Sequence, residues 1–265
     1  MMEANQIQSI LARLEEQEEV RILYACESGS RAWGFPSANS DYDVRFIYVR
    51  PRNWYLSVDL EHRRDVIERP VQGEIDLSDW DFRKALGLFR KSNPPLLEWL
   101  NSPIVYLEAT GAAATLRALL GEYYSPAACA HHYLHMARGN FREYLSGSEV
   151  WVKKYFYVLR PLLAVKWIEA GHGVAPMAFS VLVDRIITDP DLKVAIARLV
   201  EAKRRGDELD RGPMIPVITS FIEEEMSRLA TLPLSLPGAA PPIEPLNELF
   251  RSVLEEAWAN KNAAR

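Results

Sequence analysis

Residues 27–46 read ESGSRAWGFPSANSDYDVRF and place a Gly-Ser pair ten residues before two aspartates that one residue separates. Gly29 and Ser30 follow a β-forming segment, so the backbone can approach a phosphate closely and the serine adds a hydroxyl. Asp41 and Asp43 stand where a second such segment begins, and strand alternation turns both carboxylates toward one face, where they suit Mg2+. Each pair alone is typical of a turn or a solvated loop, but together they predict a phosphate and metal site.

The sequence around this stretch predicts an α/β unit that ends near residue 110. Apolar residues recur at helical spacing in residues 5–19. Three segments rich in β-forming residues are expected to be strands: residues 20–26, 43–49 and 73–80. Asp81 is expected to cap a helix that follows the third strand. We therefore assign residues 1–110 to a catalytic domain.

The second half of the chain shows helical periodicity almost throughout. Segments with apolar residues at helical spacing are residues 112–120, 127–145, 153–169, 194–204, 221–229 and 244–258. Residues 232–245 hold five prolines and one glycine, which predicts a surface connection before the last helix. We expect residues 111–265 to form an all-helical domain that helps to bind the substrate and the nucleotide.

The composition is typical of an ordinary soluble protein. The 265 residues are 48% hydrophobic and 25% charged, and the formal net charge of -5 allows polyanion binding only through a local basic cleft. The two cysteines, Cys26 and Cys129, are far apart, so neither a disulfide framework nor a zinc site is expected, and a reducing cytoplasm fits best. No stretch approaches ~20 consecutive apolar residues, so no membrane insertion is expected. The sequence does not indicate an oligomeric state.

The order and spacing of these motifs carry a family resemblance. A Gly-Ser pair, ten residues and then Asp-x-Asp-hydrophobic resembles the fingerprint of the DNA polymerase β-like nucleotidyltransferase superfamily. Three longer stretches resemble the predicted nucleotidyltransferases of the RNA repair pathway DNA polymerase β family: GSRAWGFPSANSDYDVRFIYV (29–49), DLSDWDFRKALGLFRKSNPPLLEWLNSPIVY (76–106) and KKYFYVLRPLLAVKWI (153–168). This wider similarity covers roughly residues 20–170.

The resemblance implies an α+β fold, with a small mixed β-sheet flanked by helices in the catalytic domain. It also implies Mg2+, with Mn2+ as a substitute, and transfer of a nucleoside monophosphate from an NTP such as ATP, with release of pyrophosphate. In this pattern Gly29 and Ser30 hold the β and γ phosphates. Asp41 and Asp43 ligate both metal ions, and a carboxylate on a later strand helps to deprotonate the acceptor. The family's name implies RNA ends as acceptors, and a small molecule or a protein hydroxyl is the alternative.

Three acidic residues compete for the role of that last carboxylate. Asp76 is flanked by apolar residues, as the superfamily's third acid usually is, and we assign it as a catalytic residue and metal ligand. Glu74 shares its face in a regular strand, whereas Asp79 points to the other face. A β-bulge would change which acid faces the site, so Glu74 and Asp79 stay open as alternatives.

Basic and aromatic residues are candidates for binding the nucleotide. Arg31 either contacts a phosphate or forms a structural ion pair. Arg45 alternates with Asp43 and is expected on the same face, where it balances the acidic cluster. Lys153 and Tyr157 are four residues apart on a predicted helix, so they share a face that can clamp a triphosphate and stack a base.

Two further groups of side chains are weaker candidates. Lys154 and Arg160 lie in the same helical stretch as the lysine above and are either phosphate ligands or ordinary helix residues. His131 and His135 are four residues apart, a spacing that can ligate zinc, but no third ligand is evident. We expect these two and His132 to line the cleft or to pack between helices.

The leading hypothesis is a cytoplasmic, metal-dependent nucleotidyltransferase with a role in RNA repair. The alternative is a non-catalytic, nucleotide-binding regulatory protein on the same scaffold. Degenerate members are expected to lose a metal carboxylate, whereas this chain keeps Asp41, Asp43 and a candidate third acid. The acids therefore favour the enzyme.

Overall fold

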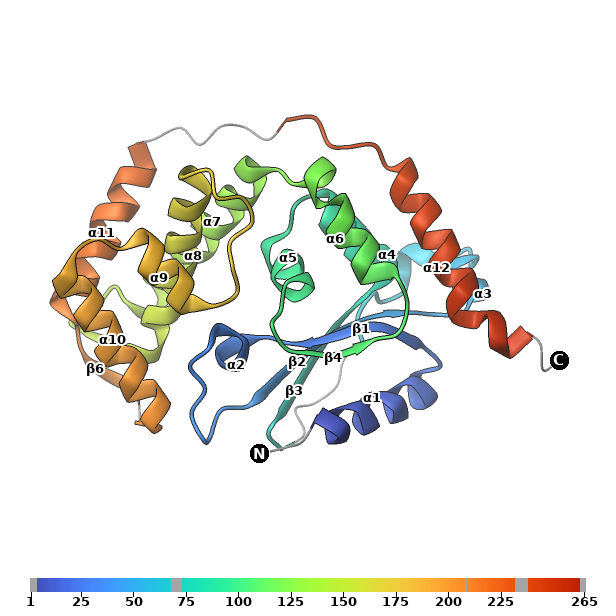
Figure 1. Ribbon diagram of the computed structural model, residues 1–265, viewed down its shortest axis with the longest axis horizontal. Coiled ribbons are helices and arrows are strands. Elements are labelled where there is room, and N and C mark those ends of the chain that lie inside the picture. Colours follow the sequence, from blue (N-terminus) through green and yellow to red (C-terminus); the bar gives the residue numbers. More distant parts are fainter. Residues whose placement is uncertain (1–3, 68–72, 208, 232–237, 263–265) are drawn as a thin grey trace.

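The chain folds around a four-stranded mixed sheet with helices on both faces, which confirms the predicted α+β class (Figure 1). The computed structural model describes residues 4–67, 73–207, 209–231 and 238–262. The strands are β1 (Arg21–Glu27), β2 (Tyr42–Val49), β3 (Ile75–Asp81) and β4 (Val105–Glu108), in the order β3-β2-β1-β4. β2 is parallel to β3 and antiparallel to β1, and β1 is antiparallel to β4.

The three predicted strands lie within two residues of their expected bounds. β4 is not predicted from the sequence, because its four residues are too few to show a clear alternation. As predicted, Asp81 caps the helix that follows β3, α4 (Phe82–Arg90), and its carboxylate accepts the Arg83 N–H at 2.8 Å.

One face of the sheet is covered by α1 (Ala4–Glu18), which lies below the sheet in Figure 1. The buried stripe of this helix consists of Ile7, Leu11 and Leu14. Val44 and Phe46 of β2 belong to the same apolar cluster. Because side chains alternate along a strand, this packing turns Asp43 and Arg45 toward the other face.

Helices from both halves of the chain cover that other face: α4, α5 (Pro94–Leu100), α6 (Ala112–Tyr123) and α12 (Glu244–Asn262). Trp80 of β3 stacks on Trp99 of α5 with ring centroids 3.8 Å apart. Phe250 of α12 meets Tyr55 edge-on at 5.0 Å. Tyr55 ends the short helix α3 (Arg52–Tyr55), so the last helix of the chain lies against the sheet unit.

The helices on the left of Figure 1 are α7 (Pro126–Tyr144), α8 (Tyr155–Glu169), α9 (Phe179–Ile186), α10 (Pro190–Arg205) and α11 (Pro216–Thr231). A two-stranded antiparallel sheet of β5 (Glu149–Trp151) and β6 (Arg211–Pro213) interrupts them, which helical periodicity does not predict. Single 3-10 turns occur at η1 (Leu60–His62) and η2 (Val152–Lys154). Residues 232–237 of the expected proline-rich connection lie outside the described residues. None of the helices that the structure describes is long and apolar enough to cross a membrane.

Candidate active site

The Gly-Ser pair opens a short helix, α2 (Gly29–Trp33), that starts directly after β1. Gly29 has a φ of +58°, and a Cβ at this position would stand 2.0 Å from Oδ2 of Asp43. A larger residue would be strained at this φ and would have to displace the Asp43 carboxylate, so both the backbone conformation and the space favour glycine. The Ser28 N–H donates to the Asp43 carbonyl at 2.8 Å. The predicted turn is therefore a helix start that lies against the second aspartate.

Two carboxylates meet on the face of the sheet opposite α1. Asp43 of β2 and Asp76 of β3 are direct partners in the parallel register. The Arg45 guanidinium lies between them, 2.9 Å from Oδ1 of Asp43 and 2.8 Å from Oδ2 of Asp76. Burial raises the pKa of Asp43, the nearby Arg45 lowers it, and the Asp76 carboxylate raises it. The pair is therefore an acidic site in which one cation is shared by two carboxylates.

The three candidates for the third acid lie in different surroundings. Asp79 is buried on the other face, where its carboxylate accepts the Ile67 N–H at 2.8 Å. Burial raises the pKa of Asp79 to about 7. Glu74 is exposed in the turn before β3, and its carbonyl accepts the Tyr42 N–H at 2.8 Å. The register of β2 and β3 is regular from residue 42 to 48, so Asp76 alone of the three lies beside Asp43.

A small cleft of about 120 Å³ joins the aspartates to the helical half of the chain. Its lining residues are Ser30, Trp33, Phe35, Asn39, Ser40, Asp41, Asp43, Lys153, Phe156, Tyr157 and Lys203. Tyr157 lines the same cleft as Asp43. Partial burial raises the pKa of Tyr157, and the negative charge of Asp43 raises it further. The cleft thus brings together Ser30, Asp41, Asp43, Lys153 and Tyr157 of the predicted site.

Lys203 at the end of α10 is a cleft residue that the sequence does not reveal. Its ammonium group lies 3.3 Å from Oγ of Ser37 and 3.5 Å from Oγ of Ser40. Burial lowers the pKa of Lys203, the positive charge of Lys153 lowers it further, and Asp41 opposes both. The cleft is therefore lined by two lysines as well as by carboxylates.

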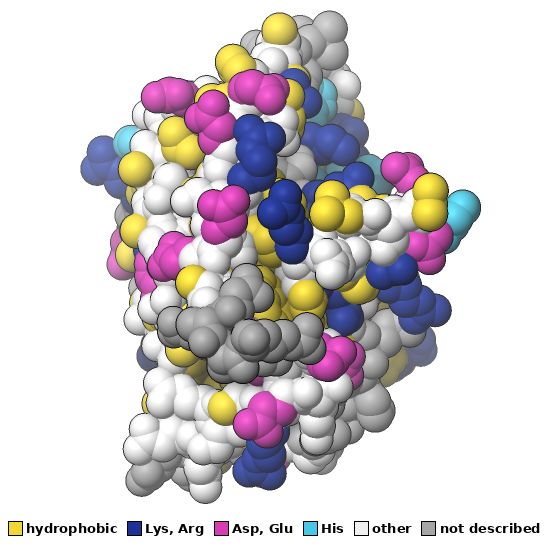
Figure 2. Space-filling view, turned by 90° about the vertical axis from the view of Figure 1, so that its right-hand side faces the viewer, with side chains coloured by type: hydrophobic (Ala, Val, Ile, Leu, Met, Phe, Trp, Pro, Cys, Tyr) yellow, Lys and Arg dark blue, Asp and Glu magenta, His cyan; other side chains and the backbone are white. Residues whose placement is uncertain are grey.

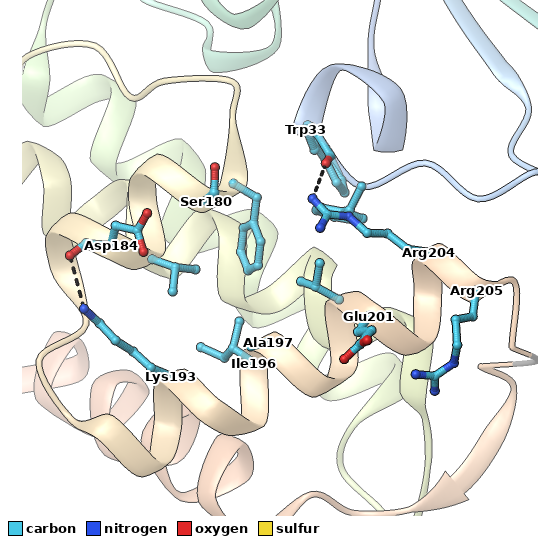
Figure 3. Close-up of a pocket in the computed structure, with 14 residues that line it drawn as sticks. Trp33, Ser180, Asp184, Lys193, Ile196, Ala197, Glu201, Arg204 and Arg205 are labelled. Carbon is cyan, nitrogen blue, oxygen red and sulfur yellow. Dashed lines mark hydrogen bonds between the residues drawn. The ribbon is translucent and has the colours of Figure 1, made fainter.

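A larger cavity of about 730 Å³ lies between α9, α10 and the segment from Trp33 to Phe35 (Figure 3). Trp33 and Phe35 line both this cavity and the cleft. Figure 3 shows Arg204 of α10 reaching toward this segment, where it donates to the Gly34 carbonyl at 2.8 Å. This bond ties α10 to the end of α2 and so helps to place the neighbouring Lys203 in the cleft.

Arg31 shapes the loop before β2. Its guanidinium donates to the carbonyls of Ser40, at 2.7 Å, and Asp41, at 3.2 Å, and lies over the Tyr42 ring at 3.8 Å. These contacts hold the loop that carries Asp41. Arg31 is not among the residues that line the cleft. Arg31 is thus bonded to backbone carbonyls and a ring in the described residues, and these contacts are structural without being the expected ion pair.

Arg160 and Lys154 occupy different surroundings from Lys153. Arg160 is buried and donates to Glu98 at 2.6 Å, so its charge serves a structural ion pair. The Lys154 ammonium lies over the rings of Tyr144 and Tyr157, at 4.2 and 4.7 Å. Of the three basic residues in this stretch, the structure places Lys153 in the cleft.

The three histidines lie on α7, where His131 and His135 are exposed and His132 is half-buried. Burial lowers the pKa of His132, and the charge of His135 lowers it further. In the part of the chain that the structure describes, no three His, Cys, Asp or Glu side chains converge closely enough for a preformed metal site. This holds for the histidines and equally for Asp41, Asp43 and Asp76.

Glu27, the last residue of β1, is a second feature that sequence reasoning missed. Its side chain is fully buried behind the site, and burial raises its pKa to about 6. One carboxylate oxygen accepts the Asp43 N–H at 2.9 Å, and the other accepts the Tyr106 hydroxyl. An acidic residue directly after the buried segment ILYAC (22–26) was the available signal.

Comparison with known proteins identifies the family. The chain matches the model of the RNA repair pathway DNA polymerase beta family over residues 3–252. It is 51% identical over 249 residues to the uncharacterized protein YcgL of Bacillus subtilis (strain 168), across 94% of this chain and 95% of that protein. A nucleotidyltransferase-like protein from Exiguobacterium sibiricum 255-15 shares 12% identity at a TM-score of 0.33, over 85% of this chain and 74% of its own. The chain belongs to the RNA repair pathway DNA polymerase beta family, a polymerase β-like nucleotidyltransferase family.

Proposed function

We propose that this chain transfers a nucleoside monophosphate from an NTP to an acceptor hydroxyl and releases pyrophosphate. The observation that carries the proposal is the pairing of Asp43 with Asp76 beside Gly29. Two carboxylates on neighbouring strands, next to a glycine that leaves the backbone accessible, suit a divalent ion and a phosphate chain together. Membership of the family supports the same reaction class.

The donor set fits Mg2+, with Mn2+ as a substitute. Mg2+ is usually held by one or two carboxylates together with substrate phosphates and water, so a preformed three-ligand site is not required. Asp43 and Asp76 supply two carboxylates, and Asp41 lines the cleft immediately before β2. When bound, the metal supplies charge neutralisation for the attacking and leaving oxygens.

The triphosphate is expected to lie in the small cleft. Ser30 offers a hydroxyl from the start of α2. Lys153 in the 3-10 turn η2, just before α8, and Lys203 in α10 each offer an ammonium group. Tyr157 and Trp33 meet edge-on at 5.5 Å and give the cleft an aromatic wall. Charge-assisted hydrogen bonds to phosphate are the strong ones, so these groups can orient the leaving pyrophosphate.

The acceptor hydroxyl is assigned to the side of Asp76. The Asp76 side chain is 40% exposed, against 26% for Asp43, so it is the acid that solvent and an acceptor reach more easily. Asp76 takes the hydroxyl proton as the acceptor oxygen attacks the α phosphate. An RNA end is the acceptor that the family name favours. Figure 2 shows basic and acidic side chains interspersed on the face near α3 and α12, so this face alone does not suggest a broad RNA surface.

The proposal is tested by incubating the protein with each α-labelled NTP, Mg2+ or Mn2+, and separate pools of RNA, small metabolites and the protein itself. Transfer of label to one pool with release of pyrophosphate is the expected result, and the labelled pool identifies the acceptor class. Tight NTP binding without label transfer or pyrophosphate in any pool would overturn it.

One observation favours the non-catalytic alternative. Arg45 already pairs with both Asp43 and Asp76 and cancels one of their two negative charges, so the pair can persist without a metal ion. In a regulatory protein that binds a nucleotide without turnover, this guanidinium would take the place of the metal ion between the two acids. Mg2+-independent NTP binding together with undetectable pyrophosphate release would support that function instead.

A further inference from the structure

Glu27 is a buried carboxylate that the proposed reaction does not use. Its side chain has 0% exposure. Within the described parts of the chain it forms no ion pair with a Lys, Arg or His side chain, although Arg31 acts on it at longer range. Burying a carboxylate is costly unless hydrogen bonds compensate, so the contacts of this side chain explain why the fold tolerates it.

The contacts of Glu27 lead directly to Asp43. Its Oε1 accepts the Asp43 N–H at 2.9 Å, and its Oε2 accepts the hydroxyl of Tyr106 on β4. Its own backbone is fastened to the segment before β4, since its N–H donates to the Ile104 carbonyl at 2.9 Å and its carbonyl accepts the Ser102 hydroxyl at 2.6 Å. Glu27 therefore links β4, at one edge of the sheet, to Asp43 on β2.

This link occurs where β1 leaves the sheet. Ser28 donates its backbone N–H to the Asp43 carbonyl, but the Asp43 N–H turns to the Glu27 carboxylate. A side-chain acceptor thus replaces a backbone acceptor at the end of the ladder. The chain is then free to start α2 at Gly29, which lies against the Asp43 side chain. The backbone of Asp43 is held by Glu27 and Ser28, the two residues that directly precede Gly29.

We propose that Glu27, backed by Tyr106, is a positioning residue that fixes Asp43 for metal binding and catalysis. The inference rests on the proposed function and adds a residue to it. Glu27 acts through the backbone of Asp43 and touches neither the metal nor the substrate. Partners that orient a ligand in this way typically change metal affinity or activity by roughly 10- to 100-fold when removed.

The experiment compares Glu27→Ala and Glu27→Gln in steady-state pyrophosphate release at varied Mg2+. The alanine leaves the Asp43 N–H without its acceptor, so kcat should fall and the Mg2+ concentration for half-maximal rate should rise, by roughly 10- to 100-fold together. The glutamine keeps an acceptor oxygen for that N–H and an amide that donates to Tyr106, so it should restore both values. Tyr106→Phe should shift both values in the same direction as Glu27→Ala, but less.

Asp79→Ala is the matched control, because Asp79 is also a buried carboxylate that accepts a backbone N–H, at Ile67 on the other face. Asp79→Ala should lose stability. The Mg2+ concentration for half-maximal pyrophosphate release by its folded molecules should stay as in the wild type. Equal Mg2+ dependence in Glu27→Ala and the wild type would overturn the inference, as would a glutamine variant as impaired as the alanine.

Binding of Mn2+, followed by electron paramagnetic resonance on the same variants, separates this inference from the proposed reaction. If the wild type released no pyrophosphate, the proposed reaction would fail. Weaker Mn2+ binding in Glu27→Ala than in Glu27→Gln would still support the positioning role. Identical Mn2+ binding in both variants would overturn it whatever the outcome of the activity assay.

Discussion

Asp76 and Asp79 lie three residues apart on the same strand, yet the two faces of that strand give them opposite surroundings. Asp76 is 40% exposed and shares Arg45 with Asp43. Asp79 is 3% exposed and bonds a backbone N–H. Exposure and partners, rather than residue type, therefore separate an acid that can meet a substrate from one that holds a loop. We call the face that carries Asp43, Arg45 and Asp76 the site face. The face that packs against α1 and carries Val44, Phe46 and Asp79 is called the covered face.

The largest expected effect is the loss of activity on the site face. Asp43→Asn replaces a carboxylate with an amide, which coordinates Mg2+ poorly. The loss of several kcal/mol of charge stabilisation corresponds to a fall in kcat of about a thousandfold. Pyrophosphate release measures it, and thermal unfolding checks that the variant is folded. A folded variant with undiminished kcat would show that Asp43 is not a metal ligand.

The next effect comes from the close approach of α2 to the site face. Gly29→Ala places a Cβ 2.0 Å from Oδ2 of Asp43 at a positive φ, so the acid must move. A displacement of this kind is expected to lower kcat by roughly 100-fold. Gly87→Ala in α4 is the control, because its Cβ would meet nothing within 4 Å. Equal activity in the two variants would contradict the tight packing at Gly29.

A smaller effect is expected where α10 reaches the site face. Lys203→Met removes an ammonium group from the cleft while it keeps a similar side-chain length. Loss of one charged hydrogen bond to a phosphate should raise KM for the NTP roughly tenfold, with a lesser change in kcat. Lys193→Met, on the same helix but lining the larger cavity, should leave KM unchanged. A KM increase of the same size in both variants would argue against a specific phosphate contact.

The smallest effect concerns stability on the covered face. Burial raises the pKa of Asp79 to about 7, well above its value of about 3.9 in an unfolded chain. Between these two values the folded state binds the extra proton, so the contribution of Asp79 to stability falls as pH rises from about 4 to 7 and stays low above that.

Asp79→Asn removes this contribution and keeps an acceptor for the Ile67 N–H. Its free energy of unfolding in urea, minus that of the wild type, should therefore be about 1–3 kcal/mol larger at pH 8 than at pH 5, which means that the variant gains stability relative to the wild type. A constant difference between the two proteins across this range would show that Asp79 does not titrate abnormally.

The sequence predicts the features of the two faces that follow from the alternation of side chains along a strand. Alternation along β3 places Asp76 and Asp79 on opposite faces, and the regular register with β2 leaves that argument intact. The Gly-Ser pair and the Asp-x-Asp pair are close in sequence, so their meeting follows from one strand connection. The four-residue β4 is too short to give a periodic signal.

Contacts between distant segments could not be predicted. Lys203 lies more than 160 positions after Ser40 in the sequence, yet both line the cleft. The hydrogen bond from Arg204 to the Gly34 carbonyl holds α10 in the position that allows this. Glu27 is buried because β4 supplies Tyr106, and β4 itself is not predicted. The sequence leaves Arg160 open as a phosphate ligand or an ordinary helix residue, and its ion pair with Glu98 of another helix decides between them. Such partners are set by tertiary packing and not by spacing along the chain.

Pyrophosphate release measured side by side for the wild type, Asp76→Asn and Asp79→Asn tests the central claim most directly. The three proteins differ by one carboxylate on one face or the other of the same strand, and urea titration gives the folded fraction of each. We expect the wild type and Asp79→Asn to release pyrophosphate at similar rates per folded molecule and Asp76→Asn to lose most of its activity. Full activity in Asp76→Asn together with an inactive, folded Asp79→Asn would contradict the assignment of the site face.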